Sequence, residues 1–349
     1  MRRVVLAVIV VAMWTGTVWA EEEVFLRGQA KSIKGDLKEE NARGITLGKM
    51  PIPAGTIEDV VYHDLKPVSV RLEYRNNGVK AEKDGKQAAA IAVYEATLKG
   101  IDPGQKSVER HLEYKLAVLY ARQARDEGGS MEAAITRLKN FNAKHTDCWQ
   151  LTTTHKLLAR ILLEQKKFAE AEETYKALAA ASVPDDVKHE AELSAALVSL
   201  AAGKHDLAQK KLDALIARLP KNSPYVARAR IGQAECLAVK KPEAAREQLR
   251  QIIKETTDRS LKAAAYNALG ESFFKAKMLK EARWEFLWVD LEFNQDRAEH
   301  AKALYHLMEI FHQLGEPERA RECREALLET QFNGLEYQRL AKEKKLAAE

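Results

Sequence analysis

The chain has 349 residues, of which 46% are hydrophobic and 31% are charged. This is the composition of a folded, water-soluble protein, and the length allows two ordinary domains. The formal net charge is only +5. Because nucleic-acid binding leaves a strongly basic footprint, we expect no nucleic-acid partner.

The first twenty residues form a segment of their own. Arg2 and Arg3 precede an apolar run over residues 4–13, and small residues stand at Val18 and Ala20. This is the layout of a secretory signal peptide. We predict a signal peptide over residues 1–20, cleavage after Ala20 and no membrane span in the mature chain, since the apolar run is short. The expected location is periplasmic or extracellular in a bacterium, and an uncleaved N-terminal anchor is the alternative.

Residues 21–80 are predicted to form a small all-β module. Short runs of strand-forming residues alternate with turn residues, and we expect strands at 24–28, 32–38, 44–47, 57–62 and 68–74. A glycine-containing strand, the run GITL (44–47) and the segment IPAGTIEDVVY (52–62) follow one another. This order is similar to the small SH3-like or Sm-like β-barrels that precede helical repeats in some exported bacterial proteins. The resemblance implies a barrel-like fold and transfers no site residue.

From about residue 111 the sequence repeats itself. An alanine that opens the second helix of each unit recurs every 37 residues, with a last interval of 38. Bulky apolar residues follow four and seven positions later, except that the last unit breaks the first of these columns. A helix with this pattern needs a partner helix pressed against the alanine. The alanines are Ala134, Ala171, Ala208, Ala245, Ala282 and Ala320.

These units are similar to tetratricopeptide (TPR) repeats. The resemblance is carried by residues 166–178, 204–215 and 277–286, with 267–274 as a first helix, and by Gly270 and Ala159 at the small position of the family's first helix. It spans residues 111–331, with a period longer than the family's length of about 34 residues. The implied fold is mainly α, a TPR-like α-hairpin solenoid of about six repeats over residues 111–349. We expect a cap helix (86–99) and linker within 81–110, and a closing helix at 335–346.

The three cysteines are spread along the predicted solenoid. Cys148, Cys236 and Cys323 fall in different repeats. A stacked array holds separated repeats beyond the reach of a disulfide. We therefore expect small buried side chains and no disulfide.

Stacked hairpins create a concave groove lined by the first helices, and such surfaces hold extended peptides or partner segments. Some TPR proteins clamp a peptide's terminal carboxylate with Lys, Asn and Arg, but Leu193 and Leu197 replace polar residues in the third repeat, so a full clamp is absent. A solvated face is the alternative for the polar groove positions. The repeat register places there Lys156, Arg160, Glu164, Arg230, Asn267, Glu271, Lys275, Tyr305 and Glu309.

The second helix of the fifth repeat carries an apolar stripe that the other repeats lack. Trp284, Leu287, Trp288 and Leu291 have the spacing i, i+3, i+4, i+7, on a helix that already has a core stripe. Tryptophans are enriched in interface hot spots. We expect this stripe to bind a partner protein, another copy of the chain or the β module. Packing within the chain, including against the closing helix, is the alternative.

Three polar clusters are candidate metal or catalytic sites. None has the spacing of a compact metal motif or of an acid–base pair in a pocket, and a polar turn or a solvated helix face explains each one more simply. We predict no catalytic residue, no metal and no cofactor. The clusters are His145, Asp147, Cys148 and His155; His306, Glu309 and His312; and Glu58, Asp59, His63 and Asp64.

Together these patterns predict an exported scaffold for protein–protein interaction that is not an enzyme. It would bind a partner protein or peptide through its helical repeats. Two alternatives remain open: an accessory protein or weak hydrolase acting on cell-envelope polymers, and a structural protein that associates with itself.

Overall fold

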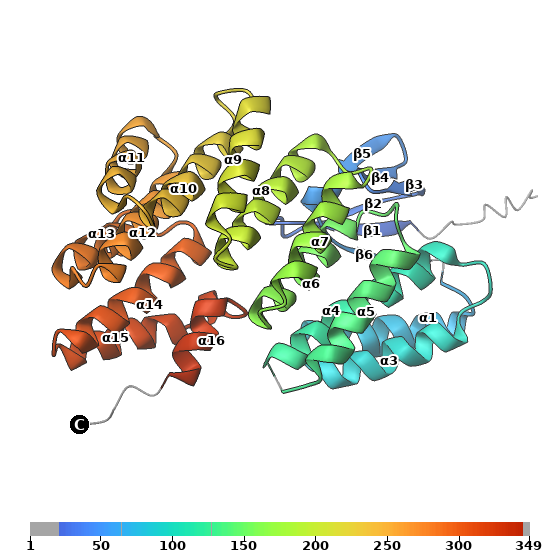
Figure 1. The fold of residues 1–349 in the computed structure, drawn as a ribbon. Helices are drawn as coiled ribbons and strands as arrows, with labels where there is room; N and C mark the ends of the chain where they lie inside the picture. The colour runs from blue at the N-terminus through green and yellow to red at the C-terminus, as the bar shows by residue number, and fades with distance from the viewer. Residues whose placement is uncertain (1–20, 64, 127, 345–349) are drawn as a thin grey trace, which may run out of the picture.

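The computed structural model describes residues 21–63, 65–126 and 128–344 (Figure 1). The predicted signal peptide lies outside the described residues. Within them, no helix combines the length and the apolar character needed to cross a membrane. A small β region is followed by a curved array of helical hairpins, so the predicted fold is confirmed.

The β region consists of two antiparallel sheets of three strands each. One has the order β2-β1-β6 and the other β3-β4-β5. Val24 pairs with Val60 in the first and Ile45 with Ile52 in the second, and all four side chains are buried. The strands are β1 (Glu22–Leu26), β2 (Ile33–Gly35), β3 (Leu37–Asn41), β4 (Gly44–Leu47), β5 (Met50–Pro53) and β6 (Ile57–Val61).

The strand expected at 68–74 is wrong. This segment is helix α1 (Val68–Glu73), which continues through a wider helical stretch (Tyr74–Val79) into α2 (Lys80–Lys83). Tyr74, Gly78 and Ala81 are buried, and their spacing of three to four residues is that of one helix face. This buried face packs on α3 (Gln87–Gly100). The helical periodicity therefore outweighs the strand preference of Val68 and Val70. Helix α3 lies in the segment where a cap helix was expected, at 86–99.

Six helical hairpins follow in the described residues. The first helices range from 14 residues in α6 to 21 in α4, with 17 in α8, α12 and α14. The pairs are α4 (Lys106–Asp126) with α5 (Met131–Lys144), α6 (Leu151–Glu164) with α7 (Phe168–Ala180), α8 (Asp185–Ala201) with α9 (His205–Arg218), α10 (Pro224–Ala238) with α11 (Pro242–Glu255), α12 (Arg259–Lys275) with α13 (Leu279–Leu291), and α14 (Arg297–Gln313) with α15 (Pro317–Leu328).

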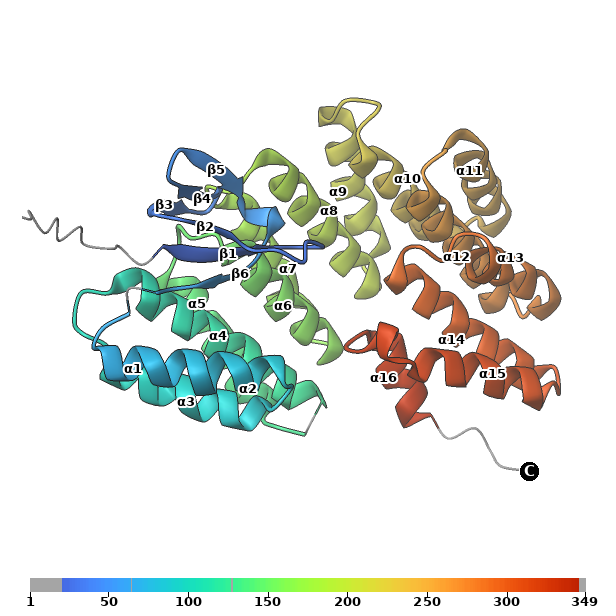
Figure 2. The same ribbon diagram turned by 180° about the vertical axis from the view of Figure 1, so that it is seen from behind.

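The repeated alanines lie where the two helices of each hairpin meet. All six are at most 1% exposed, as a close helix–helix approach requires. The first helices contact one another from repeat to repeat, α8 with α10, α10 with α12 and α12 with α14. They form the inner layer of the array, and α9, α11, α13 and α15 lie outside it (Figures 1 and 2). The three cysteines are buried and free, as expected.

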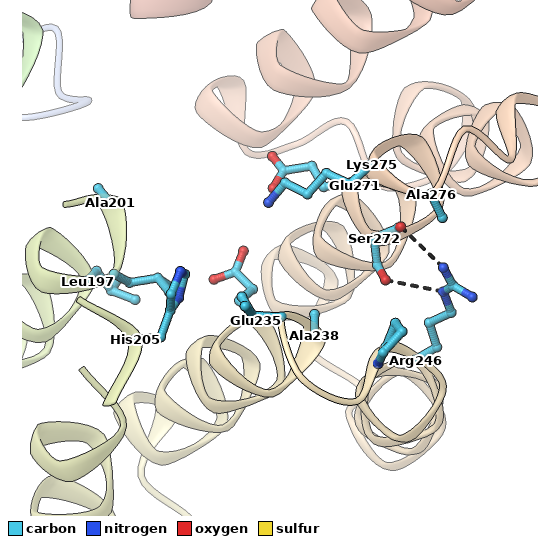
Figure 3. A pocket seen from close by; sticks show the side chains of 13 residues that line it. Leu197, Ala201, His205, Glu235, Ala238, Arg246, Glu271, Ser272, Lys275 and Ala276 are labelled. Carbon is cyan, nitrogen blue, oxygen red and sulfur yellow. Dashed lines mark hydrogen bonds between the residues drawn. The ribbon is translucent and has the colours of Figure 1, made fainter. Parts of the chain in front are cut away.

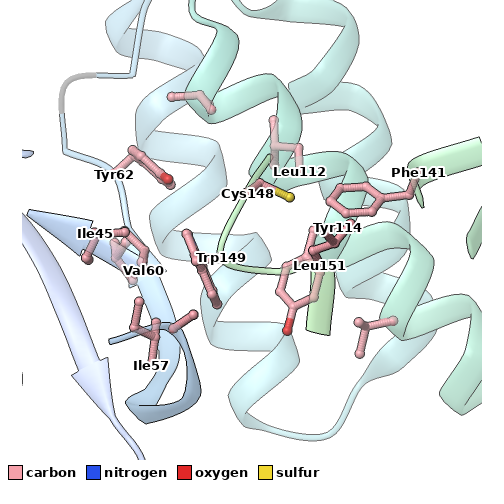
Figure 4. Packing of buried hydrophobic residues seen from close by; sticks show 14 of the residues in the cluster. Ile45, Ile57, Val60, Tyr62, Leu112, Tyr114, Phe141, Cys148, Trp149 and Leu151 are labelled. Carbon is pink, nitrogen blue, oxygen red and sulfur yellow. The ribbon is translucent and has the colours of Figure 1, made fainter. Parts of the chain in front are cut away.

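The β region and the first repeats share one hydrophobic core (Figure 4). Trp149, in the connection between α5 and α6, is its largest fully buried side chain. The ring packs edge-on against Tyr114 at 5.6 Å between centroids, and its Nε1 donates to Glu40 at 3.3 Å. A residue of the solenoid therefore fixes the β region in place.

The other end of the array returns to its beginning. After a short turn (Thr330–Phe332), helix α16 (Glu336–Glu343) packs on α14 and α15, which confirms the expected closing helix. Arg125 on α4 donates to the carbonyl oxygen of Gly334 at 2.8 Å and to Glu164 on α6 at 3.0 Å. The C-terminal turn thus touches the first two repeats, and the array closes on itself (Figure 2).

Candidate functional site

The apolar stripe on α13 faces solvent. Trp284 is 60% exposed, Trp288 51% and Leu291 73%, while Leu287 is half-buried and packs against the core. The core stripe of the same helix, Ala282, Phe286 and Val289, is fully buried. Helix α13 therefore presents a second apolar face, the α13 surface, formed by Trp284, Trp288 and Leu291.

Aromatic stacking holds part of this surface in a fixed orientation. Tyr266 on α12 stacks on Trp288 at 6.1 Å between ring centroids and on Phe293 at 5.4 Å. The guanidinium of Arg283 lies 5.7 Å from the ring of Trp284. Offset stacks and cation–π contacts restrict ring rotation, so less side-chain entropy is lost when a partner binds.

Within the described residues, no other part of the chain covers the α13 surface. The β region packs on the first repeats instead. The closing helix places Tyr337 against Tyr305 at 5.5 Å and His306 at 6.1 Å, on α14. Both segments that were expected to cover the stripe are occupied elsewhere.

The predicted groove residues lie on the first helices, but most have partners within the chain. Lys156 pairs with Glu190 at 2.6 Å and Arg230 with Glu255 at 3.0 Å. Asn267 is buried and donates to the backbone and side chain of Glu299. Glu164 accepts from Arg125. The contacts of Lys156, Asn267 and Glu164 join neighbouring repeats, whereas that of Arg230 joins the two helices of its own hairpin.

The acidic groove residues near α14 form one ionic cluster. Glu271 lies 2.6 Å from the Nζ of Lys302 and 3.5 Å from the Nε2 of His306. Glu309 contacts His306 at 3.7 Å and pairs with Lys344. Burial alone would raise the pKa of both acids. The neighbouring cations reverse this, lowering the pKa of Glu271 and bringing that of Glu309 to about 2.

A cavity of about 710 Å³ opens where the ends of α8, α10 and α12 meet the starts of α9 and α11. Its walls are mostly apolar, with Leu197, Leu200 and Val239 among them. His205, Glu235 and Lys275 supply polar groups (Figure 3). Of the predicted groove residues, only Glu271 and Lys275 line it. We call it the α10 cavity.

Glu235 differs from the other acids of the inner layer. Within the described part of the chain, no hydrogen bond or ion pair reaches its carboxylate. Burial raises its pKa above the ordinary value, and the carboxylates of Glu271 and Glu299 add to this against the opposing charges of Lys302 and Lys275. An acid with a perturbed pKa beside a cavity is a candidate for a binding-site residue.

Sequence reasoning missed Glu235 and His205. The signal available was an acid in the otherwise uncharged run from Ile231 to Ala238. Its position in the cavity depends on how α8, α10 and α12 converge, which the repeat register alone does not give. His205 begins α9 and resembles an ordinary polar helix start.

The residues of the first polar cluster do not converge on a common point. His145 pairs with Glu113 at 2.6 Å, Asp147 accepts from the backbone of Ala42 at 2.7 Å, and His155 Nδ1 contacts the carbonyl of Leu151 at 2.9 Å. In the second cluster, His306 and Glu309 belong to the ionic cluster described above, and His312 is exposed. No group of three possible ligands meets in the described residues.

The acidic group of the β region is also dispersed. Asp59 accepts from Lys115 on α4 at 2.9 Å, and the same ammonium donates to Glu82 at 2.9 Å. Glu58 is exposed, His63 lies 3.9 Å from Glu23, and Asp64 lies outside the described residues. Lys115 is 7% exposed, so this network joins the β region to the helices.

Comparisons with known proteins bear on the fold. No protein-family model matches the chain, and no curated protein matches it. Among solved structures, it is similar to a tetratricopeptide repeat protein from Parabacteroides merdae, with a TM-score of 0.52 and 17% identity over 79% of this chain and 98% of that one. It is also similar to the apo form of RapI, with a TM-score of 0.50 and 12% identity over 76% and 77%. These likenesses support the TPR-like fold.

Proposed function

We propose that this chain is an exported scaffold that binds another protein through the α13 surface. The observation that carries the proposal is the exposure of two tryptophans and a leucine on one face of one helix. Isolated exposed hydrophobic residues are normal, but adjacent tryptophans are typical of the centre of an interface. The TPR-like fold, which commonly presents binding surfaces, agrees with this role.

Export rests on the sequence of residues 1–20, whose layout is that of a signal peptide. The mature protein would then begin at Glu21 and act outside the cytoplasm of a bacterium. Mass spectrometry of the protein recovered from the periplasm or medium tests this directly. An N-terminus at Glu21 would support export with cleavage, whereas a retained apolar segment would indicate an anchor.

A photo-crosslinking amino acid placed at position 291 tests the binding surface in the native cell. The matched control is position 207, because Leu207 is also exposed, at 41%, but lies on α9. We expect a protein partner to crosslink from 291 and not from 207. Equal patterns from both positions would contradict a specific surface, and crosslinks only between copies of the chain would show self-association instead.

Once the partner is known, its affinity for the double variant Trp284→Ala with Trp288→Ala gives the energetic test. Hot-spot tryptophans contribute about 2 kcal/mol or more each, so we expect affinity to fall at least about a hundredfold. Because both side chains are half exposed, the melting temperature should change little. A large loss of stability with unchanged affinity would show that the stripe is structural.

A further inference from the structure

The α10 cavity has the size and character of a ligand site. Its volume of about 710 Å³ lies within the range of about 300–1,000 Å³ found for small-molecule and cofactor pockets. Leucine and alanine side chains of α8 and α10, together with Val239 just after α10, form its apolar walls. Residues of α9, α11 and α12 complete the lining, and no residue of the α13 surface belongs to it.

Two polar groups at the cavity have no partner in the described chain. One is the carboxylate of Glu235, and the other is Nδ1 of His205, a buried atom without a hydrogen bond. Both side chains point into the same space in Figure 3. Unpaired polar groups beside apolar walls are costly, and a ligand with several N–H donors would satisfy both.

Of the other charged side chains at the cavity, Glu271 and Arg246 are already paired, and Lys275 is exposed to solvent. Glu271 pairs with Lys302. Arg246 donates to the Oγ of Ser272 at 3.2 Å and pairs with Glu243. The helices α8, α10 and α12 end at the cavity, whereas α9 and α11 begin there, so their dipoles oppose one another. The group that favours a cation is therefore the unpaired carboxylate of Glu235.

We propose that the α10 cavity binds an arginine side chain of an extended peptide. Glu235 accepts hydrogen bonds from the guanidinium, which has five N–H donors and also reaches His205. The apolar walls contact the methylene groups and the neighbouring apolar residues of the peptide. This site is separate from the α13 surface, so the two proposals can be tested independently of each other.

The test uses the mature chain and an end-blocked peptide, Ala-Leu-Arg-Leu-Ala. A second peptide replaces arginine by citrulline, which keeps the shape and removes the charge. Ligand-observed NMR titration gives both affinities. We expect the arginine peptide to bind at least about tenfold more tightly than the citrulline peptide, since citrulline keeps N–H donors but loses the ion pair with the Glu235 carboxylate. Glu235→Gln should remove this preference.

Matched variants separate the local contact from overall charge. Glu247→Gln removes the same charge from α11, where the side chain is 75% exposed, and should leave binding unchanged. Lys275→Gln removes a like charge near the cavity and should strengthen binding a few-fold. The double variant Trp284→Ala with Trp288→Ala should bind the peptide as the wild type does.

Several outcomes would overturn the proposal. These are equal binding of the two peptides, unchanged binding by Glu235→Gln, an equal loss in Glu247→Gln, or no binding of the arginine peptide. Ethylguanidinium is the small-molecule arm, and binding as tight as that of the peptide would replace the peptide ligand by a free guanidinium compound. Because Glu235→Gln removes an unfavourable charge, its thermal unfolding should show an intact fold, and loss of binding would then reflect the site.

Discussion

Glu235 carries a charge that its surroundings oppose. The carboxylate lies at the edge of an apolar cavity, faces Glu271 and Lys275 on α12 and Glu299 and Lys302 on α14, and borders His205. An acid whose pKa is raised in the folded state lowers stability when it is ionised. Such a destabilising charge is retained at a binding site when the bound ligand compensates for it.

Replacing Glu235 by Gln is therefore predicted to stabilise the unliganded protein in a pH-dependent way. The pKa is raised to about 7, above the unfolded value, so the folded state holds the proton longer and stability falls as pH rises between these values. Because the side chain is only partly buried, we expect a gain of about 1–2 kcal/mol at pH 8 and almost none at pH 4. Urea unfolding at the two pH values measures it.

Glu247→Gln is again the control, since that side chain is exposed and should show little change at either pH. Equal stabilisation of Glu235→Gln at both pH values would contradict an ionisation effect. Destabilisation at pH 8 would mean that the carboxylate has a structural partner in solution.

At the scale of helices, the approach of α12 to α13 determines how the α13 surface is presented. Gly270 lies where the ring of Phe286 packs on α12, and a Cβ there would come within 2.8 Å of Cζ. Phe286 is fully buried and cannot move aside. The small residue in the first helix of this repeat is thus required by the aromatic residue in the second.

Gly270→Ala is predicted to destabilise the protein by about 1–2 kcal/mol. Overpacking of a core costs about 1–3 kcal/mol, and the better helix propensity of alanine returns up to about 1 kcal/mol. Thermal or urea unfolding measures the change. Adding Phe286→Leu should make the alanine tolerable, because the smaller side chain leaves room for the new Cβ. The double variant should then lose less stability than the sum of the two single variants.

Gly232→Ala on α10 is the matched control for that experiment. Its Cβ would lie 3.1 Å from the side-chain ends of Leu197 and Leu212, which can shift more readily than a buried ring. We expect it to be close to neutral. If both glycine variants were equally destabilised, close packing of α12 on α13 would not be the cause.

Repeating elements were predictable from sequence because a local pattern specifies them. The alanine column marked every hairpin, and the stripe on α13 was visible as a departure from the repeat. Features that depend on long-range contacts were not predictable in this way. Trp149 fills the core of the β region, and Tyr74 belongs to a helix because α3 covers it. Lys156, Glu164, Asn267 and Glu271 pair across repeats, which a single repeat does not reveal.

The whole array is shaped by the contact between its two ends. Arg125 and Glu164 are almost fully buried, with side chains 7% and 3% exposed. The guanidinium bridges Glu164 and the carbonyl of Gly334, 209 residues further along the chain. Few contacts of a solenoid connect distant repeats, so this one constrains the curvature of the array.

Arg125→Ala is predicted to open the array. Removal of the guanidinium leaves Glu164 buried without its partner, which costs about 3 kcal/mol or more, and frees the turn at Gly334. We expect a lower melting temperature together with a larger radius of gyration in small-angle X-ray scattering. The two readouts together distinguish opening from a purely local loss of stability.

Arg125→Lys is the informative comparison, because lysine keeps the charge but lacks the planar group that reaches two acceptors at once. It should keep Glu164 paired while losing the contact to Gly334, so most of the stability returns but the radius stays larger than that of the wild type. An unchanged radius in both variants would show that packing of α16 on α14 and α15 is enough to close the array. In that case the ends would meet because of the repeat geometry, and Arg125 would only stabilise the junction.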